Sequence, residues 1–407
     1  MKRKAVLLLQ GGGALGAFQC GAWQALHPFL RENGIELVAV AGASIGATNA
    51  ALIARHCHDD DGGCGALQEF WHRTVATPPT PFIPLPGEYW RAWNGLLTGL
   101  LLGNRALFRP MVQHWNPFAG SVRFHLPLYS TRSAERVLAQ AVGEYRGRTP
   151  LLAVGATDIE SGEAVLFDSA HGSVTPKMLA ASIAIPLLFS PVEIDGRHYW
   201  DAEMRSNTLL QEVFGLLRHL LPRAGPPEEF LVIVVDMFSA SALRTPDSAI
   251  ESQYRLMNIF LGGKLHHDRR VFETGNAYLE AIERLRDAVR RTGSAPLAAA
   301  VDEEYRRALA CQPGRVEILH VGRRNLAYEH ISRDFDYSPS YIARLMEQGY
   351  ASAEEALDRF EVAHRTENAP LSVSRPAPRA GDEKGAGSRV DRETGTGADR
   401  AAYPRIV

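Results

Sequence analysis

The chain has few cysteines and no repeated cysteine spacing. Only four occur among its 407 residues, Cys20, Cys57, Cys64 and Cys311, and no two form a CxxC pair. This pattern argues against a disulfide framework and favours a reducing compartment. A chain of this length with 45% hydrophobic residues can bury an ordinary core without disulfides or metal ions.

Long hydrophobic runs are also missing. Ala5–Leu9 is shorter than the roughly seven apolar residues of a signal-peptide core. Gly95–Leu102 is far shorter than the roughly 20 residues that span a bilayer. The net charge is only −2, so no electrostatic feature points to nucleic acid as a partner. We therefore expect a cytoplasmic protein and leave peripheral membrane contact open.

Strands and helices alternate at the start of the chain. Ala5–Leu9 and Leu37–Ala41 predict buried strands, and each is followed by glycines and then by apolar residues at helical spacing. This order predicts an α/β protein with a three-layer α/β/α fold and a mainly parallel central sheet. We assign residues 1–215 to this core, interrupted at about 78–127 by an insert rich in Trp and Leu.

Further strands are predicted later in the chain. Phe230–Asp236 and Glu317–Val321 are short apolar runs, and long segments with helical periodicity lie between them. We assign residues 216–365 to these strands and to a helical carboxy-terminal extension. Residues 366–407 are rich in Gly, Ala, Pro, Arg and Asp, with Tyr403 as their only aromatic residue. Such a segment buries too little apolar area to offset its ordering entropy, so we expect a disordered tail.

A tight turn is predicted in the second half of the core. Asp195-Gly196 separates the short segments Val192–Ile194 and His198–Trp200. An Asp-Gly pair supplies the two left-handed residues that a two-residue hairpin loop requires. The sequence therefore predicts an antiparallel strand pair that ends close to Asp201.

The segment Gly42-Ala43-Ser44-Ile45-Gly46 follows a predicted strand directly and begins a predicted helix. An abrupt strand-to-helix bend strains the residue at its centre, and small neighbours such as Gly42 and Gly46 relieve the crowding. The bend raises the Ser44 Oγ clear of the sheet, beside a helix N-terminus that stabilises negative charge. We predict Ser44 as a nucleophile. The alternative is a small-residue turn in which Ser44 only caps the helix.

A glycine-rich loop follows the first predicted strand. Gly11, Gly12 and Gly13 can present backbone N–H groups to an oxyanion without interference from Cβ atoms. The loop also fits the G-x-G-x-x-G pattern of a dinucleotide site, with Gly16 as its last member. That site needs an acidic residue at the end of the second strand, whereas Glu36 stands before this strand. A nucleotide-binding oxidoreductase is therefore the weaker interpretation.

Four ordered blocks within about residues 5–210 resemble the patatin-like phospholipases, and the later part resembles the carboxy-terminal extension of a bacterial subgroup. The blocks are Gly11-Gly12-Gly13-Ala14-Leu15-Gly16, Gly42-Ala43-Ser44-Ile45-Gly46, Ala181-Ser182-Ile183-Ala184-Ile185-Pro186, and Tyr199-Trp200-Asp201 with Asn207-Thr208. Four blocks in the right order are more specific than any one of them.

The resemblance implies a serine acyl hydrolase, of phospholipase A or lysophospholipase type, that acts on lipid or other acyl esters without a metal or cofactor. Its Ser-Asp dyad assigns Asp201 as the base for Ser44. The family acid is usually followed by glycine, whereas Ala202 and Glu203 follow it here. If the family backbone has a positive φ there, Ala202 costs about 1 kcal/mol and shifts the loop. The alternative is a lipid-binding or regulatory pseudoenzyme with an impaired dyad.

Other signals are weaker. The His56-Cys57-His58 cluster and the aspartates after it have neither tetrahedral nor calcium-loop spacing, so we expect a solvated loop and no metal site. His198 precedes Asp201 but is expected to face solvent. Three interpretations of the 78–127 insert remain open. It caps the active site, it contacts a lipid surface as a peripheral element, or it packs on the domain as ordinary core.

Overall fold

The computed structural model describes most of the chain. The described residues are 3–111, 128–147, 149–206, 208–220, 228–238, 245–312, 314–326 and 332–367. The chain divides into two units, Met1–His364 and Arg365–Val407. Residues 112–127 of the expected insert and 368–407 of the expected tail lie outside the described residues. The predicted division near residue 215 stays a prediction.

A central sheet of eight strands has the order β10-β9-β1-β2-β5-β8-β7, and β6 also pairs with β5. The strands are β1 (Lys4–Leu9), β2 (Glu36–Gly42), β5 (Leu151–Asp158), β6 (Ala164–Asp168), β7 (Val192–Ile194), β8 (Arg197–Asp201), β9 (Glu228–Asp236) and β10 (Gly314–Gly322). The pairs from β10 to β5 are parallel, whereas β6 and β8 run antiparallel to β5. A separate antiparallel pair joins β3 (Arg109–Pro110) to β4 (Tyr129–Ser130).

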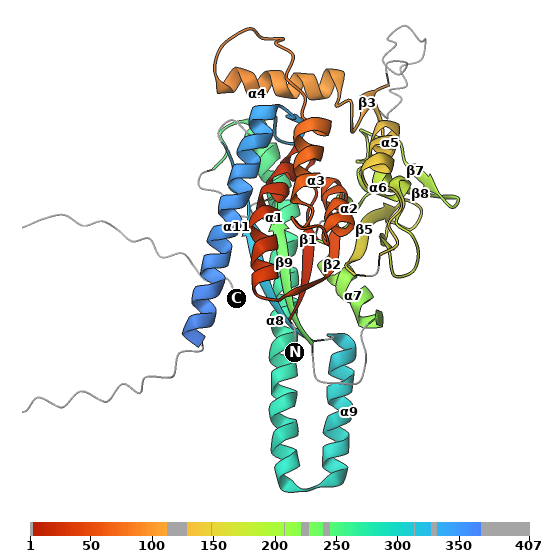
Figure 1. Cartoon of the computed structure of the whole chain (residues 1–407). Helices are drawn as coiled ribbons and strands as arrows, with labels where there is room; N and C mark the ends of the chain where they lie inside the picture. Colours follow the sequence, from red (N-terminus) through yellow and green to blue (C-terminus); the bar gives the residue numbers. More distant parts are fainter. Residues whose placement is uncertain are drawn as a thin grey trace, which may run out of the picture. The chain divides into compact units, whose positions relative to one another are not determined.

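Helices connect the strands and lie beside the sheet. The α-helices are α1 (Gly16–Glu32), α2 (Ile45–His56), α3 (Cys64–Glu69), α4 (Glu88–Leu97), α5 (Arg132–Ala141), α6 (Pro176–Ser182), α7 (Leu210–Leu220), α8 (Ala249–Thr292), α9 (Ala295–Cys311) and α11 (Pro339–Glu367). The short 3₁₀-helices are η1 (Gly13–Leu15), η5 (Ala202–Met204) and η6 (Arg333–Phe335), and the short π-helices are η2 (Phe70–Val75) and η3 (Thr98–Leu102). Figure 1 shows α8 and α9 side by side as a hairpin that extends beyond the sheet.

The sheet is buried on both faces. Alternate side chains of β1 enter two different cores, Leu7 and Leu9 on one face and Val6 and Leu8 on the other. Side chains of α1, α2 and α11 complete the first core, and side chains of α7 complete the second. Because successive strand residues point to opposite faces, a strand covered on both sides must be apolar throughout. The expected three-layer α/β/α fold with a mainly parallel sheet is confirmed.

The predicted hairpin is present. β7 pairs antiparallel with β8, and Ile194 lies opposite Arg197. Asp195 and Gly196 form the loop with φ angles of 51° and 79°, the left-handed values that a two-residue hairpin turn requires. None of the described helices is long and apolar enough to cross a bilayer.

Candidate active site

Ser44 occupies a strained bend between β2 and α2. Its φ and ψ angles are 53° and −129°, outside the regions that residues with a Cβ atom normally adopt. A Cβ atom on Gly42 would lie 2.2 Å from the Gly46 carbonyl oxygen, and one on Gly46 would lie 2.2 Å from the Leu9 carbonyl oxygen. Backbone atoms therefore pack directly against one another at this bend, and only glycine fits at the positions two residues before and two residues after Ser44.

The Ser44 side chain does not serve the helix that it precedes. It makes no capping hydrogen bond to the first turn of α2, so the alternative in which Ser44 only caps the helix is wrong. The Ser44 N–H instead donates to the Ser182 Oγ at 3.0 Å. The residue Ser44 has an exposed fraction of only 3% and lies just beyond the C-terminal end of β2.

The pairing of β5 brings Asp201 to Ser44. β6 overlaps the parts of β5 that pair with β2 and with β8, so β2 and β8 must share the other edge of β5. On that edge Gly42 of β2 lies opposite Val154. Further along the same edge Asp201 of β8 lies opposite Ala156. The last residue of β8 therefore lies just beyond the end of β2, where Ser44 follows.

Hydrogen bonds of the backbone fix the positions of Asp201 and Ser44 relative to the same segment, residues 182–184. The Asp201 N–H donates to the Ala184 carbonyl at 3.0 Å, two residues beyond the Ser182 that accepts from Ser44. Thr157 Oγ1 donates to the Asp201 carbonyl at 2.9 Å. Sequence reasoning missed the positions of Ser182 and Thr157. The signal for Ser182 was its place in the Ala181–Pro186 block, to which no role had been assigned.

The Asp201 carboxyl group is fully buried, and its environment favours the protonated form. Burial raises its pKa to about 7, although hydrogen bonds from the Glu203 N–H and the Ser44 hydroxyl lower it. Oδ1 accepts from the Glu203 N–H at 2.9 Å, whereas Oδ2 is buried without a hydrogen bond of good geometry. Such bonds are often loose in a free enzyme and tighten when substrate binds. The arrangement yields a carboxyl group that titrates near neutral pH beside a serine hydroxyl.

The glycine loop lies against this pair. Gly12 and Gly13 have φ angles of 146° and 56°, which residues with side chains rarely adopt. A Cβ atom on Gly11 would lie 2.7 Å from Ser44 Cβ and 1.9 Å from Glu203 Oε1. All three glycines that were predicted for an oxyanion loop therefore belong to a segment that touches the serine.

A network of buried polar side chains forms hydrogen bonds with the backbone at both ends of the glycine loop. Gln19 Nε2 donates to the Gln10 carbonyl at 2.6 Å, just before the glycines. Asn49 Nδ2 donates to the Gly16 carbonyl and to the Gln19 side chain, and Trp71 Nε1 donates to Asn49 Oδ1. These side chains join β1, α1, α2 and η2 around the loop. Their pattern in the sequence carried no signal of this network, because polar residues on helices usually face solvent.

Ala202 does not strain the loop that holds the acid. It lies in η5, is fully buried and is not among the residues with positive φ. Its Cβ packs close to Gly155, where an added Cβ would approach to 2.9 Å. The condition for the expected cost, a positive φ at Ala202, is therefore not met, because the chain after Asp201 turns with helical geometry.

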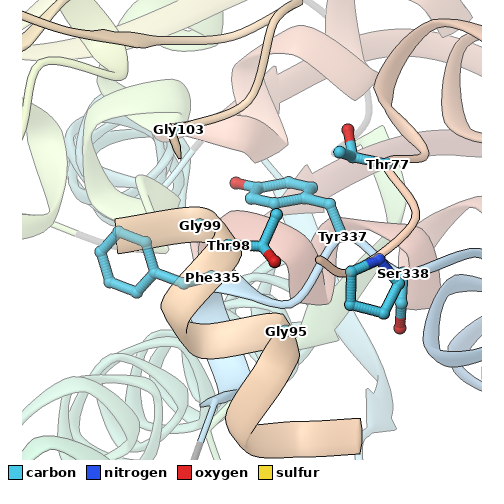
Figure 2. Close-up of a pocket in the computed structure, with 9 residues that line it drawn as sticks. Thr77, Gly95, Thr98, Gly99, Gly103, Phe335, Tyr337 and Ser338 are labelled. Carbon is cyan, nitrogen blue, oxygen red and sulfur yellow. The ribbon is translucent and has the colours of Figure 1, made fainter. Parts of the chain in front are cut away.

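The extension and the insert meet beside the glycine loop. An added Cβ on Gly13 would lie 2.5 Å from the Asp334 carbonyl oxygen of η6, and one on Gly99 would lie 2.4 Å from that of Phe335. Figure 2 shows the small cavity between η3 and the chain from Phe335 to Ser338. Its volume is about 10 Å³, room for no more than one water molecule. This cavity is therefore no acyl-chain pocket.

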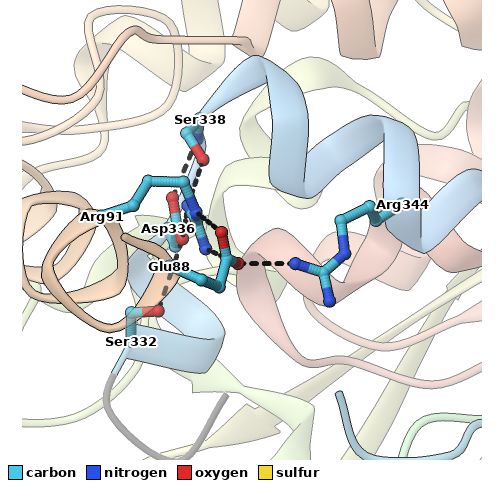
Figure 3. Close-up of polar contacts among 6 residues, drawn as sticks. All are labelled: Glu88, Arg91, Ser332, Asp336, Ser338 and Arg344. Carbon is cyan, nitrogen blue, oxygen red and sulfur yellow. Dashed lines mark hydrogen bonds and ion pairs between the residues drawn. The ribbon is translucent and has the colours of Figure 1, made fainter. Parts of the chain in front are cut away.

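Charged side chains join the insert to the start of α11, as Figure 3 shows. Arg91 pairs with the fully buried Asp336 at 2.5 Å and with Glu88 at 2.9 Å, and Arg344 reaches Glu88 at 2.5 Å. Burial alone would raise the pKa of Glu88, but Arg91 and Arg344 lower it below its usual value. Asp336 also accepts from the Ser338 N–H at 3.0 Å. The described part of the insert is therefore fastened to the extension.

Two minor expectations can be compared with the structure. His198 is half exposed and its Nδ1 lies 2.9 Å from Glu160 Oε1, so the prediction that it faces solvent is confirmed. In the described part of the chain, no three His, Cys, Asp or Glu side chains gather in a metal-binding group. The His56–His58 region contacts Asp59 and the Thr149 carbonyl instead.

Comparison with known proteins identifies the family of the chain. A family model described as patatin-like phospholipase matches residues 7–214, and a second, described as patatin phospholipase, matches residues 272–369. The chain belongs to the patatin-like phospholipase family, as its motifs predicted. No curated protein matches it. Among solved structures, the crystal structure of VipD from Legionella pneumophila is similar to this chain with 15% sequence identity and a TM-score of 0.33. The alignment covers 88% of this chain and 67% of the VipD chain.

Proposed function

We propose that the protein is a serine acyl hydrolase in which Ser44 is the nucleophile and Asp201 the general base. One observation carries the proposal: a serine in a strained strand-to-helix bend lies beside a fully buried carboxyl group that titrates near neutral pH. A general base works best when its pKa is close to the working pH. Membership in a family of phospholipases supports a lipid ester as the substrate.

The steps follow from this arrangement. Ionised Asp201 takes the proton of the Ser44 hydroxyl while the Oγ attacks the ester carbonyl carbon. The resulting oxyanion is stabilised by N–H groups of the Gly11–Gly13 loop and by the N-terminus of α2. The intermediate collapses, the alcohol leaves with the proton, and an acyl-serine remains. Water, deprotonated by Asp201, then releases the carboxylic acid and restores the serine.

A fluorophosphonate probe tests the nucleophile. The probe phosphonylates an activated serine and releases fluoride, so wild type is expected to be labelled and Ser44→Ala to remain unlabelled. Ser161→Ala is the control, because Ser161 lies in an exposed turn, where its hydroxyl bonds to Asp158 and accepts from the Glu163 N–H, and this variant should label as wild type does. Equal labelling of wild type and Ser44→Ala would contradict the proposal and favour a lipid-binding pseudoenzyme.

The pH profile tests the base. Because only ionised Asp201 can accept the proton, kcat/KM for a soluble ester should fall tenfold per pH unit below about 7 and level off above it. Activity is expected to fall on the acidic side because burial raises the pKa of Asp201, so the carboxyl group stays protonated, and inactive as a base, to a higher pH. The rate of Ser44→Ala, measured alongside, is subtracted as background. A profile with its inflection near the usual value of 3.8 would contradict a buried base.

A further inference from the structure

The backbone of the nucleophile bonds to a buried hydroxyl. The Ala43 N–H still donates to the Leu9 carbonyl of β1 at 3.1 Å, and the hydrogen bonds of α2 begin after it. Ser44 lies between these two sets of bonds, and its N–H donates to the Ser182 Oγ at 3.0 Å. A buried N–H without an acceptor is costly, so Ser182 takes the place of a sheet or helix carbonyl at this bend.

This hydrogen bond acts on a strained residue. Ser44 has φ and ψ angles of 53° and −129°, which residues with a Cβ atom rarely adopt and which persist only where surrounding contacts fix them. Gly42 and Gly46 leave space for the bend but do not select it. The bond to Ser182 does select it, because it fixes the direction of the Ser44 N–H and therefore the φ angle about which the side chain projects.

Ser182 is itself held firmly. It is the last residue of α6, whose first turn is capped by Thr175, and it is fully buried. Two residues later, the Ala184 carbonyl accepts from the Asp201 N–H at 3.0 Å. The same short segment therefore sets the backbone of the serine and the backbone of the acid. Because the Ser182 hydroxyl is hidden from solvent, its effect on the reaction passes through Ser44.

We propose that Ser182 is a positioning residue, which accepts the Ser44 N–H and so keeps the Ser44 hydroxyl aligned with Asp201 and with the ester carbonyl. This inference rests on the proposed function of Ser44. Because the bond occupies the Ser44 N–H, it leaves the oxyanion to N–H groups of other residues, such as those of the Gly11–Gly13 loop.

Removing the hydroxyl tests the role of Ser182. In Ser182→Ala the Ser44 N–H loses its acceptor, and the serine is free to leave its aligned position. With 4-nitrophenyl butyrate at pH 8, kcat is expected to fall by about 10²-fold, the loss that a displacement of about 1 Å produces. KM should change by less than about twofold, because Ser182 acts on the alignment of the serine and not on the binding of the ester.

A buried serine elsewhere provides the matched control. Ser169 is also buried, and its Oγ accepts the Leu152 N–H at 3.0 Å. Leu152 lies near the start of β5, whereas Asp201 pairs with Ala156 near its end. Ser169→Ala and Ser182→Ala should lose similar stability in chemical denaturation, but Ser169→Ala should keep the wild-type kcat. Equal losses of kcat in the two variants would overturn the inference, because kcat would then follow stability alone.

A conservative variant and the pH profile complete the test. Ser182→Thr keeps the hydroxyl acceptor and should recover kcat to within about fivefold of wild type. In Ser182→Ala the inflection of kcat/KM should stay at about 7, because Asp201 keeps its burial and its bond to Ala184. A threonine variant as slow as the alanine variant, or a displaced inflection, would contradict a role that is confined to Ser44.

Two further outcomes separate the inference from the proposed function. If Ser182→Ala does not fold, Ser182→Cys replaces it, and its weaker sulfur acceptor should lower kcat by about tenfold. A wild-type kcat in the variant that folds, with hydrolysis that still depends on Ser44, would overturn the inference alone. Equal hydrolysis by wild type and Ser44→Ala would overturn the proposed function and the inference with it.

Discussion

Replacing Asp201 by asparagine is expected to lower kcat/KM for a soluble ester such as 4-nitrophenyl butyrate by about 10³-fold. The amide has nearly the same shape, and its oxygen can still accept from the Glu203 N–H that now bonds to Asp201 Oδ1. It cannot take the proton of Ser44. Initial rates measured at pH 8, where the wild-type acid is ionised, give the full effect.

Stability separates lost chemistry from lost fold in this variant. The pKa of Asp201 in the folded chain is raised to about 7 from a usual value of 3.8. Ionisation of this carboxyl group therefore costs more in the folded chain than in the unfolded chain and lowers the free energy of unfolding. The acid therefore contributes less stability as the pH rises from 4 through 7, and an uncharged asparagine avoids this loss. Asp201→Asn should melt at the wild-type temperature or above it at pH 8.

A matched carboxylate provides the control. Asp168 ends β6, on the opposite edge of β5, and accepts from the N–H groups of Ala170 and His171. Asp168→Asn should keep wild-type activity. If Asp201→Asn were as active as Asp168→Asn, another group would have to activate Ser44 and the proposed dyad would be wrong.

The parts of the fold that sequence could predict are those with local causes. Ala5–Leu9 and Leu37–Ala41 are short and apolar throughout, the pattern of strands covered on both faces, and both lie in the parallel sheet. Asp195-Gly196 supplies two left-handed residues in succession, so this residue pair alone was enough to predict the hairpin. The glycines around Ser44 were readable because the bend leaves no space for Cβ atoms.

The remaining features depend on contacts between distant parts of the chain. The meeting of Asp201 with Ser44 follows from the register of β2 and β8 along β5, which no local pattern specifies. Family resemblance supplied that pairing instead. Asp334 lies more than 300 residues after the Gly13 that it contacts, and nothing in either segment indicated the other. The sequence left the φ angle of Ala202 open, because that angle depends on how η5 packs and not on residue type alone.

Replacing Gly46 by alanine is expected to lower the free energy of unfolding by about 3 kcal/mol or more. The new Cβ would lie 2.2 Å from the Leu9 carbonyl oxygen and 2.5 Å from that of Gln10. These atoms cannot move away easily, because the Leu9 carbonyl accepts from the Ala43 N–H and the Gln10 carbonyl accepts from Gln19. Relief requires α2 to withdraw from β1, which would also displace Ser44.

Chemical denaturation measures this effect, and Gly172→Ala is the control. Gly172 has a φ outside the left-handed region and no atom within 4 Å of an added Cβ, so its substitution should change stability by less than about 0.5 kcal/mol. Activity should follow stability at Gly46, because the backbone that is displaced also holds the serine. A Gly46→Ala variant with wild-type stability would mean that the bend tolerates a larger separation of α2 and β1 than these contacts allow. The serine would then owe its strained geometry to β2 and Ser182 alone.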